Sequence, residues 1–145
     1  MVLRLVVDAN VLIAAFLRDS TVRRLVTGPG LQLFVPEFIF EEFEAHLGEL
    51  RRKTKLPADQ QRELLGRLSR RFTRLPQEMI EPHLSSARRA MEHIDPHDSV
   101  YLAATMALSG DGIWSDDSHF KEQETVACWT TAEVIAAIDG PRARK

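Results

Sequence analysis

The segment Leu3-Arg4-Leu5-Val6-Val7-Asp8-Ala9-Asn10-Val11-Leu12-Ile13 joins two apolar runs through a single acidic residue. The first run, 3–7, is short and bounded by polar residues, which predicts a buried strand. The second run predicts a helix that extends to Leu17, and either Asp8 or Asn10 could cap its first turn. A buried strand that leads straight into a helix is typical of an α/β fold.

The alternation of strand and helix continues along the chain. Further strands are predicted at 31–35, 113–115 and 125–129. Helices are predicted at 21–27, 39–50, 57–72, 83–93, 98–108 and from residue 130 onward. This order predicts a three-layer α/β sandwich, with a parallel sheet of about four to five strands and helices on both faces.

The chain of 145 residues is long enough for one domain with one core. Thr130 and Glu133 have the spacing of a capping box at the start of the last helix, and Gly140 with Pro141 is expected to end that helix. We therefore expect a single domain over 1–140 and a loose basic tail at 141–145.

The composition excludes several classes of protein. The single cysteine, Cys128, excludes an internal disulfide framework and a thiolate-rich zinc site. The first apolar run carries Arg4 and lacks the features of a signal peptide. No apolar run approaches the roughly 20 residues that a membrane span needs. We expect a soluble, cytoplasmic protein without a membrane segment.

Basic residues gather in one stretch although the net charge is only −2. Nine of the nineteen fall between residues 51 and 74: Arg51, Arg52, Lys53, Lys55, Arg62, Arg67, Arg70, Arg71 and Arg74. One interpretation is a solvated helical face. The alternative is a surface that holds a phosphate backbone, with Arg51, Arg52, Lys53, Arg70 and Arg71 as the candidate contacts.

Acidic residues lie where predicted elements end or turn. Asp8 follows the first strand, and Asp116 and Asp117 follow a later one. Asp98 opens a helix, and Glu42 lies on the flank of a helix whose apolar stripe faces the core. Taken singly, each has an ordinary explanation as a helix cap, a turn residue or a surface residue. Taken together they point to one site, because ligands of open parallel sheets bind outside the carboxyl ends of the strands.

Crowded carboxylates need a cation to coexist. Four of them about 6 Å apart would repel by roughly 3 kcal/mol per pair, or on the order of 15–20 kcal/mol in all. That cost exceeds the stability of a typical domain, about 5–15 kcal/mol. Ligation by oxygen alone favours Mg²⁺ or Mn²⁺ over zinc.

Four blocks of this sequence resemble the motifs of PIN domains, the small metal-dependent nucleases that include VapC-type toxins. They are Val6-Val7-Asp8-Ala9-Asn10-Val11-Leu12-Ile13, Glu42-Phe43-Glu44-Ala45-His46-Leu47, Asp95-Pro96-His97-Asp98-Ser99-Val100-Tyr101-Leu102-Ala103-Ala104 and Ile113-Trp114-Ser115-Asp116-Asp117-Ser118-His119-Phe120. The blocks follow the family's order. The resemblance implies that Asp8, Glu42, Asp98 and Asp117 are catalytic metal ligands, with Asp95 and Asp116 as auxiliary residues.

The resemblance also implies a mechanism. One or two Mg²⁺ or Mn²⁺ ions would activate water for in-line attack on phosphorus. Asn10 and Ser115 would supply hydrogen bonds around the ligands. His119 would contact phosphate or be a surface polar residue. The expected activity is that of an endoribonuclease, plausibly the toxin of a type II toxin–antitoxin pair, with RNA as substrate, an antitoxin as partner and a homodimer as its assembly.

Three alternatives stay open from the sequence alone. The chain could cleave DNA or structured nucleic acid, since nothing in it reports on the 2′-hydroxyl. It could keep the fold as a non-catalytic nucleic-acid-binding module. A phosphoryl-transfer receiver domain fits least well, because Lys121 is the only lysine near the last two strands and no acid follows a middle strand as that chemistry requires.

Overall fold

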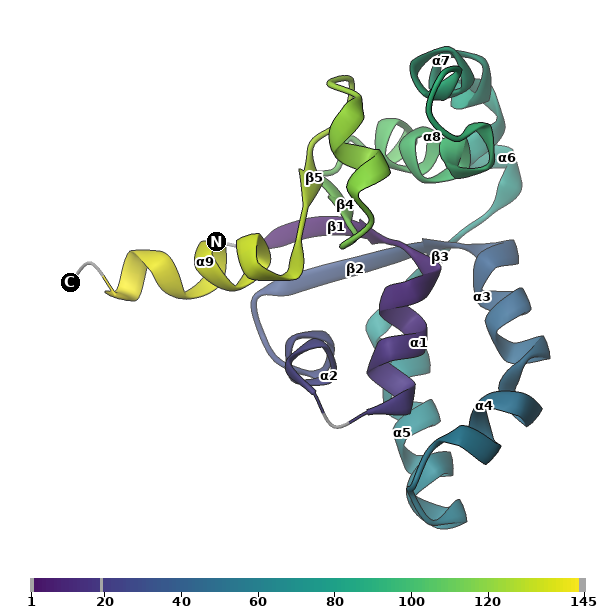
Figure 1. The fold of residues 1–145 in the computed structure, drawn as a ribbon, viewed down its shortest axis with the longest axis vertical. Helices are drawn as coiled ribbons and strands as arrows, with labels where there is room; N and C mark the ends of the chain where they lie inside the picture. The colour runs from purple at the N-terminus through teal and green to yellow at the C-terminus, as the bar shows by residue number, and fades with distance from the viewer. Residues whose placement is uncertain (1, 19, 144–145) are drawn as a thin grey trace.

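A five-stranded parallel sheet forms the centre of the molecule (Figure 1). The computed structural model describes residues 2–18 and 20–143. The strand order is β3-β2-β1-β4-β5. The strands are β1 (Leu3–Val7), β2 (Leu31–Pro36), β3 (Phe72–Leu75), β4 (Gly112–Trp114) and β5 (Cys128–Trp129). The predicted α/β class with a parallel sheet is confirmed.

Helices cover both faces of the sheet, as Figure 1 shows. One face carries α1 (Ala9–Leu17), α2 (Thr21–Thr27) and α5 (Ala58–Arg71), with α3 (Glu37–Ala45) and α4 (Leu47–Lys53) beside α1. The opposite face carries α6 (Gln77–Ile80), α7 (Leu84–Met91) and α8 (Ser99–Leu108). The last helix, α9 (Thr131–Ala143), follows β5, and three short 3₁₀ turns lie at η1 (Glu81–His83), η2 (Pro96–Asp98) and η3 (Ser118–Glu122). Of the described helices, none is long and apolar enough to cross a membrane.

The core is centred on β1, which has a neighbouring strand on each side. Leu5, Val6 and Val7 are fully buried there. The helix α8 is buried almost all round, which explains why its sequence is apolar rather than amphipathic. Burying one such aliphatic side chain stabilises the fold by about 1.5–3 kcal/mol. The sheet therefore holds the end of β1, and the acid that follows it, in a fixed place.

The helix predicted over 39–50 is two helices in the structure. His46 lies between α3 and α4 with φ −96° and ψ 4°, outside the helical range. Its Nδ1 lies 2.9 Å from the carbonyl oxygen of Glu42, which also accepts a hydrogen bond from the His46 backbone N–H at 3.1 Å. The predicted stripe still faces the core, because Ile39, Phe43 and Leu50 are buried on both sides of the break.

Two other predictions were wrong at the ends of elements. No strand was predicted at β3, and its first residue, Phe72, was placed at the end of a helix; in the structure Phe72 and Leu75 are buried while Thr73 and Arg74 between them are exposed. The last helix was expected to stop at Gly140 and Pro141, yet it continues to Ala143. A proline backbone already has a helical φ, and its missing N–H removes only one hydrogen bond from the final turns. The predicted tail at 141–145 is therefore helical through 143, and residues 144–145 lie outside the described part.

The start of α9 agrees with the sequence. Thr130 Oγ1 accepts a hydrogen bond from the Glu133 backbone N–H at 3.2 Å, and Glu133 Oε1 accepts one from the Thr130 backbone N–H at 3.0 Å. This is the predicted capping box, in which two otherwise free N–H groups are satisfied. It fixes the direction in which the chain leaves β5.

Candidate metal centre

Two neighbouring strands bring acidic residues to the same edge of the sheet. Val7, the last residue of β1, pairs with Trp114, the last residue of β4. Asp8 follows the first and Ser115 follows the second, so the two lie side by side across the sheet. Asp8 also caps α1, since its Oδ1 accepts a hydrogen bond from the Asn10 backbone N–H at 3.3 Å.

Ser115 connects two of the predicted metal ligands. Its hydroxyl donates to Asp8 Oδ2 at 2.7 Å and accepts from the Asp117 backbone N–H at 3.0 Å. Ser115 is 1% exposed and Asp8 is 7% exposed, so water competes little for this contact. The hydroxyl therefore orients the Asp8 carboxylate and fixes the backbone that carries Asp117.

Asp98 lies within electrostatic reach of the same acids. The pKa of Asp98 is raised to about 6, mainly by burial and then by the negative charges of Asp95, Asp8 and Asp117, while His119 opposes the rise. Like charges that raise a carboxyl pKa in this way lie close together. Asp98 is the residue through which the start of α8 joins the site.

Tyr101, one turn along α8 from Asp98, lies among the acids as well. Its hydroxyl accepts a hydrogen bond from the Ala9 backbone N–H at 3.3 Å. Burial raises the pKa of the Tyr101 phenol, the charge of Asp8 adds to the rise, and Asp98 and Glu42 contribute smaller amounts. The charges of Asp8 and Asp117 thus act on Asp98, and those of Asp8, Asp98 and Glu42 act on the Tyr101 phenol, so all four predicted ligands are within electrostatic reach of the start of α8.

Glu42 is the most open of the four. It is exposed on α3 and lines a groove of about 360 Å³ that runs between α1, α3 and α4. Ala9 and Ile13 of α1 form one side of this groove, and Lys53 of α4 lies farther along it. The groove therefore leads from the acids toward the basic end of α4.

The acids fit a hard divalent cation. Their ligand atoms are carboxylate oxygens, which Mg²⁺ and Mn²⁺ prefer. Burial and the neighbouring negative charges both raise the pKa of Asp98, and a bound cation would offset both effects. One buried side-chain atom in the described residues, Ser99 Oγ next to Asp98, has no hydrogen-bond partner. A hydrated ion beside α8 is one means by which such a hydroxyl could be satisfied.

The family model of the PIN domain matches residues 6–139, from β1 into α9. The chain belongs to the PIN domain family. No curated protein matches it. PIN domains are nucleases in general and typically use divalent metal, so the acids at this edge of the sheet lie where a nuclease centre is needed. Their convergence on one region gives the family assignment a physical counterpart.

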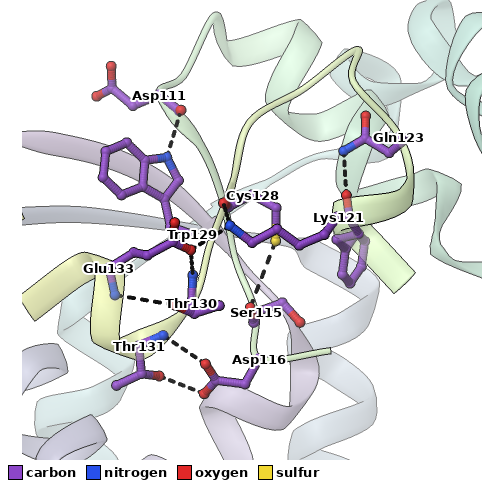
Figure 2. A network of polar contacts seen from close by, with 11 residues as sticks. Asp111, Ser115, Asp116, Lys121, Gln123, Cys128, Trp129, Thr130, Thr131 and Glu133 are labelled. Atoms are coloured by element: carbon purple, nitrogen blue, oxygen red, sulfur yellow. Dashed lines mark hydrogen bonds and ion pairs between the residues drawn. The ribbon is translucent and has the colours of Figure 1, made fainter. Parts of the chain in front are cut away.

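Asp116 has a different environment from its neighbour Asp117. Its Oδ1 accepts from the Thr131 backbone N–H at 2.7 Å, and its Oδ2 accepts from Thr131 Oγ1 at 2.6 Å (Figure 2). The same threonine hydroxyl accepts from Trp114 Nε1 at 3.0 Å. Both carboxylate oxygens of Asp116 are thus engaged at the start of α9. The sequence suggested an auxiliary metal ligand here, and the structure gives the residue a capping contact instead.

Asp95 and His119 lie beside Asp98 in this PIN domain. One ligand atom from each of the three side chains lies within 4.8 Å of the others. Asp95 Oδ1 also accepts from the His97 backbone N–H at 3.0 Å. His119 Nδ1 lies 3.4 Å from Asp117 Oδ1. Asn10, the other predicted polar neighbour, is exposed and lines a second hollow together with Asp117.

The predicted basic contacts divide into two groups. Arg51, Arg52 and Lys53 form the exposed last turn of α4, and Arg70 is exposed on α5. Arg71 is half-buried, and its guanidinium donates to the carbonyl oxygens of Val26 at 2.6 Å, Gly28 at 2.7 Å and Leu31 at 3.3 Å. These bonds fix the loop between α2 and β2, so Arg71 has a structural function in place of the predicted phosphate contact.

Tyr101 was missed by the sequence reasoning. It is the only tyrosine of the chain and lies three residues after Asp98, so the two share a face of α8. That spacing was the available signal. A lone aromatic residue in an apolar helix is more often part of the core, and Tyr101 is indeed 4% exposed while its hydroxyl reaches Ala9.

Replacement of Ser115 by alanine should weaken metal binding. The hydroxyl holds both Asp8 and the Asp117 backbone, and losing a partner that orients a metal ligand typically costs about 10–100-fold in affinity. Titration calorimetry with Mn²⁺ would measure the change. Ser118→Ala, at an exposed position of the same loop, is the control. Equal affinities for the wild type and Ser115→Ala would contradict the orienting function.

Proposed function

We propose that this PIN domain is a Mg²⁺- or Mn²⁺-dependent endoribonuclease that hydrolyses phosphodiester bonds in RNA. The observation that carries the proposal is the Ser115 hydroxyl, which joins Asp8 to the Asp117 backbone within reach of Asp98. Negative charges held near one another, with Asp8 buried and Asp98 and Asp117 partly buried, are costly to maintain unless they bind a cation. The exposed basic turn of α4 supplies the surface that a polyanion needs beside an acidic site.

The chain's own residues divide the work of this reaction. Asp8, Asp98, Asp117 and Glu42 would hold the cation, which when bound lowers the pKa of water and stabilises the charge that develops on the phosphate. Ser115 keeps Asp8 in one orientation, and α8 holds Asp98 against the end of β1. Asp98 must lose its proton before it can bind the cation. Because its pKa is raised, metal binding and therefore RNA cleavage should depend on pH.

Lys53 and Arg52 would bind phosphates along the strand. Lys53 lines the groove that contains Glu42, so a strand whose scissile phosphate lies at the acids can continue toward α4. Phosphate contacts of this type position a nucleic acid without reading its sequence. They also give binding that weakens as salt increases.

The direct test is digestion of RNA and DNA strands of the same sequence. The wild type should cleave RNA with Mg²⁺ or Mn²⁺, lose that activity in a chelator, and regain it when metal is restored. Asp8→Asn should be inactive. Preferential cleavage of DNA would replace this proposal with the deoxyribonuclease alternative, and absence of cleavage with bound metal would favour a binding module.

The proposal includes a cellular setting. An RNA-cleaving PIN domain of this size would act in the cytoplasm as the toxin of a toxin–antitoxin pair, as a homodimer that an antitoxin protein blocks. Induced expression in bacteria should halt growth, and expression of Asp8→Asn should not. Light scattering of the purified chain would test the dimer, and unimpaired growth with active enzyme present would contradict the toxin assignment.

Neutralising the basic turn of α4 should weaken RNA binding in a salt-dependent way. Each of Arg51, Arg52 and Lys53 that binds a phosphate would displace a counterion from the RNA. Changing all three to glutamine should therefore lower the slope of log binding constant against log salt concentration by about 2 for single-stranded RNA. Asp8→Asn protein allows the measurement without cleavage.

The matched control replaces Arg88 and Arg89, which are exposed on α7 across the sheet. Their replacement should leave the salt slope close to that of the wild type. Similar losses in both variants would mean that RNA responds to total charge rather than to the α4 surface.

A further inference from the structure

We propose that Asp95, Asp98 and His119 form a second cation position beside the one at Asp8 and Asp117, with Asp98 shared between the two, and that this second position prefers Mn²⁺ to Mg²⁺. The inference deepens the proposed nuclease function and rests on it only for the use made of the two ions. None of the predicted ligand sets includes an imidazole.

The geometry suits a single ion. The ligand atoms of the three side chains lie within 4.8 Å of one another. Ligands about 2.2 Å from an ion lie at most about 4.4 Å apart, so small rotations of the side chains are enough to close the site. The residues come from two segments distant in sequence, since Asp95 caps η2, Asp98 ends it, and His119 belongs to η3.

Backbone N–H groups form hydrogen bonds in both loops that carry these side chains. Asp95 Oδ1 accepts from the His97 backbone N–H at 3.0 Å. The His119 backbone N–H donates to Asp117 Oδ1 at 2.9 Å. These local bonds fix the two loops on which Asp95 and His119 each bring a ligand atom within 4.8 Å of one from Asp98.

Asp117 connects the two positions. Its Oδ1 lies 3.4 Å from His119 Nδ1. A histidine that ligates a metal usually has its other ring nitrogen beside a carboxylate, which fixes the orientation of the ring. In the proposed arrangement Asp117 serves the first ion directly and orients the imidazole for the second.

The imidazole decides which metal is favoured. Mg²⁺ takes oxygen ligands and gives up its waters reluctantly, whereas Mn²⁺ also accepts a nitrogen ligand. Two carboxylates and one imidazole leave room for water or a phosphate oxygen on the ion. The negative charge of Asp95 beside Asp98 is then offset by the cation.

The test is Mn²⁺ binding to the full chain, after removal of metal by a chelator. The wild type should bind two Mn²⁺ per chain in titration calorimetry, and its pulsed EPR spectrum should show coupling between Mn²⁺ and a histidine nitrogen. His119→Gln should lose this coupling and bind the second Mn²⁺ about tenfold or more weakly, with Mg²⁺ affinity nearly unchanged. Asp95→Asn should weaken the same step.

His97→Gln is the matched control, because His97 is an exposed histidine within the same loop as Asp95. It should retain the nitrogen coupling. Persistence of the coupling in His119→Gln, or its loss in His97→Gln instead, would overturn the proposal. His119 is exposed, so its variant should fold, which circular dichroism would verify.

The result is separable from the proposed function. RNA cleavage that requires Asp8, together with Mn²⁺ binding that is unchanged in His119→Gln, would overturn the second position alone. Nitrogen coupling that depends on His119, in a wild type that cleaves no RNA, would keep the metal position and remove the ribonuclease.

Discussion

Asparagine at position 98 should lower the rate of RNA cleavage by about 1000-fold or more and at the same time stabilise the metal-free protein. The amide keeps the shape of the side chain but removes the charge that the cation needs. In the absence of metal, that charge is disfavoured by burial and by repulsion from Asp95, Asp8 and Asp117, which His119 offsets only in part. The variant should therefore lose activity and gain stability.

The gain in stability depends on pH in a defined direction. The pKa of Asp98 is raised from 3.8 to about 6 in the folded chain, so the folded state binds the proton more tightly than the unfolded state. The resulting stabilisation is complete below the unfolded value and is lost as pH rises through about 6. At neutral pH the wild type has lost this contribution, whereas Asp98→Asn never depended on it.

Unfolding in urea with a chelator present would measure the difference. After allowance for solvent screening, Asp98→Asn should exceed the wild type by about 1 kcal/mol at neutral pH and by less near pH 5. Saturating Mn²⁺ should reverse the order, because only the wild type binds it tightly. Asp59→Asn, at an exposed position in the first turn of α5, is the control and should retain cleavage. A variant that cleaves RNA at the wild-type rate would remove Asp98 from the centre.

The sequence predicted the elements that are set by local pattern. The strand β1, the helix α2 and the capping box of α9 all occur where short-range signals placed them. Each signal is complete within a few residues: an apolar run, a breaker, or two side chains at fixed spacing. Elements that such local signals specify can therefore be predicted without knowledge of their tertiary contacts.

Features that depend on distant partners were not predictable. The apolar spacing from Ile39 to Leu50 continues across His46, so no local pattern marks the break between α3 and α4. The strand β3 exists because β2 pairs with it, and its four residues are too few for an alternating pattern to stand out. Arg71 resembles the other arginines of its helix until the loop at Val26 and Gly28 closes over it.

The same distinction applies to the candidate site. That Asp8 and Asp117 approach one another follows from strand ends in a parallel sheet, which the sequence can suggest. That Asp116 turns to Thr131 while Asp117 remains at the site depends on where α9 begins, which no spacing reports. The closeness of Asp95 and His119 is likewise tertiary, since 23 residues lie between them in the sequence.

Gly112→Ala should be the most destabilising single substitution near this site. Gly112 opens β4 with φ +148°, a conformation that residues with a side chain rarely adopt. An added Cβ would lie 2.5 Å from the Ala127 carbonyl oxygen and 2.8 Å from Trp129 Cδ1. Strain and overpacking each cost about 1–3 kcal/mol, so we expect a loss of about 3–4 kcal/mol.

The damage should reach the metal centre as well. The clash lies where β4 meets β5. The Ile113 N–H donates to the Ala127 carbonyl oxygen there at 2.9 Å. Trp129 Nε1 donates to the Asp111 carbonyl oxygen at 3.1 Å, as Figure 2 shows. Movement of β4 carries Ser115 with it, and Ser115 orients Asp8. Thermal unfolding should show a midpoint lower by about 10 °C, and Mn²⁺ affinity should fall in the same variant.

Gly48→Ala is the control, because nothing lies within 4 Å of its added Cβ in α4 and alanine favours a helix. A Gly112→Ala protein as stable as Gly48→Ala would mean that β4 and β5 can separate without cost, and the site would then need another support for Asp8.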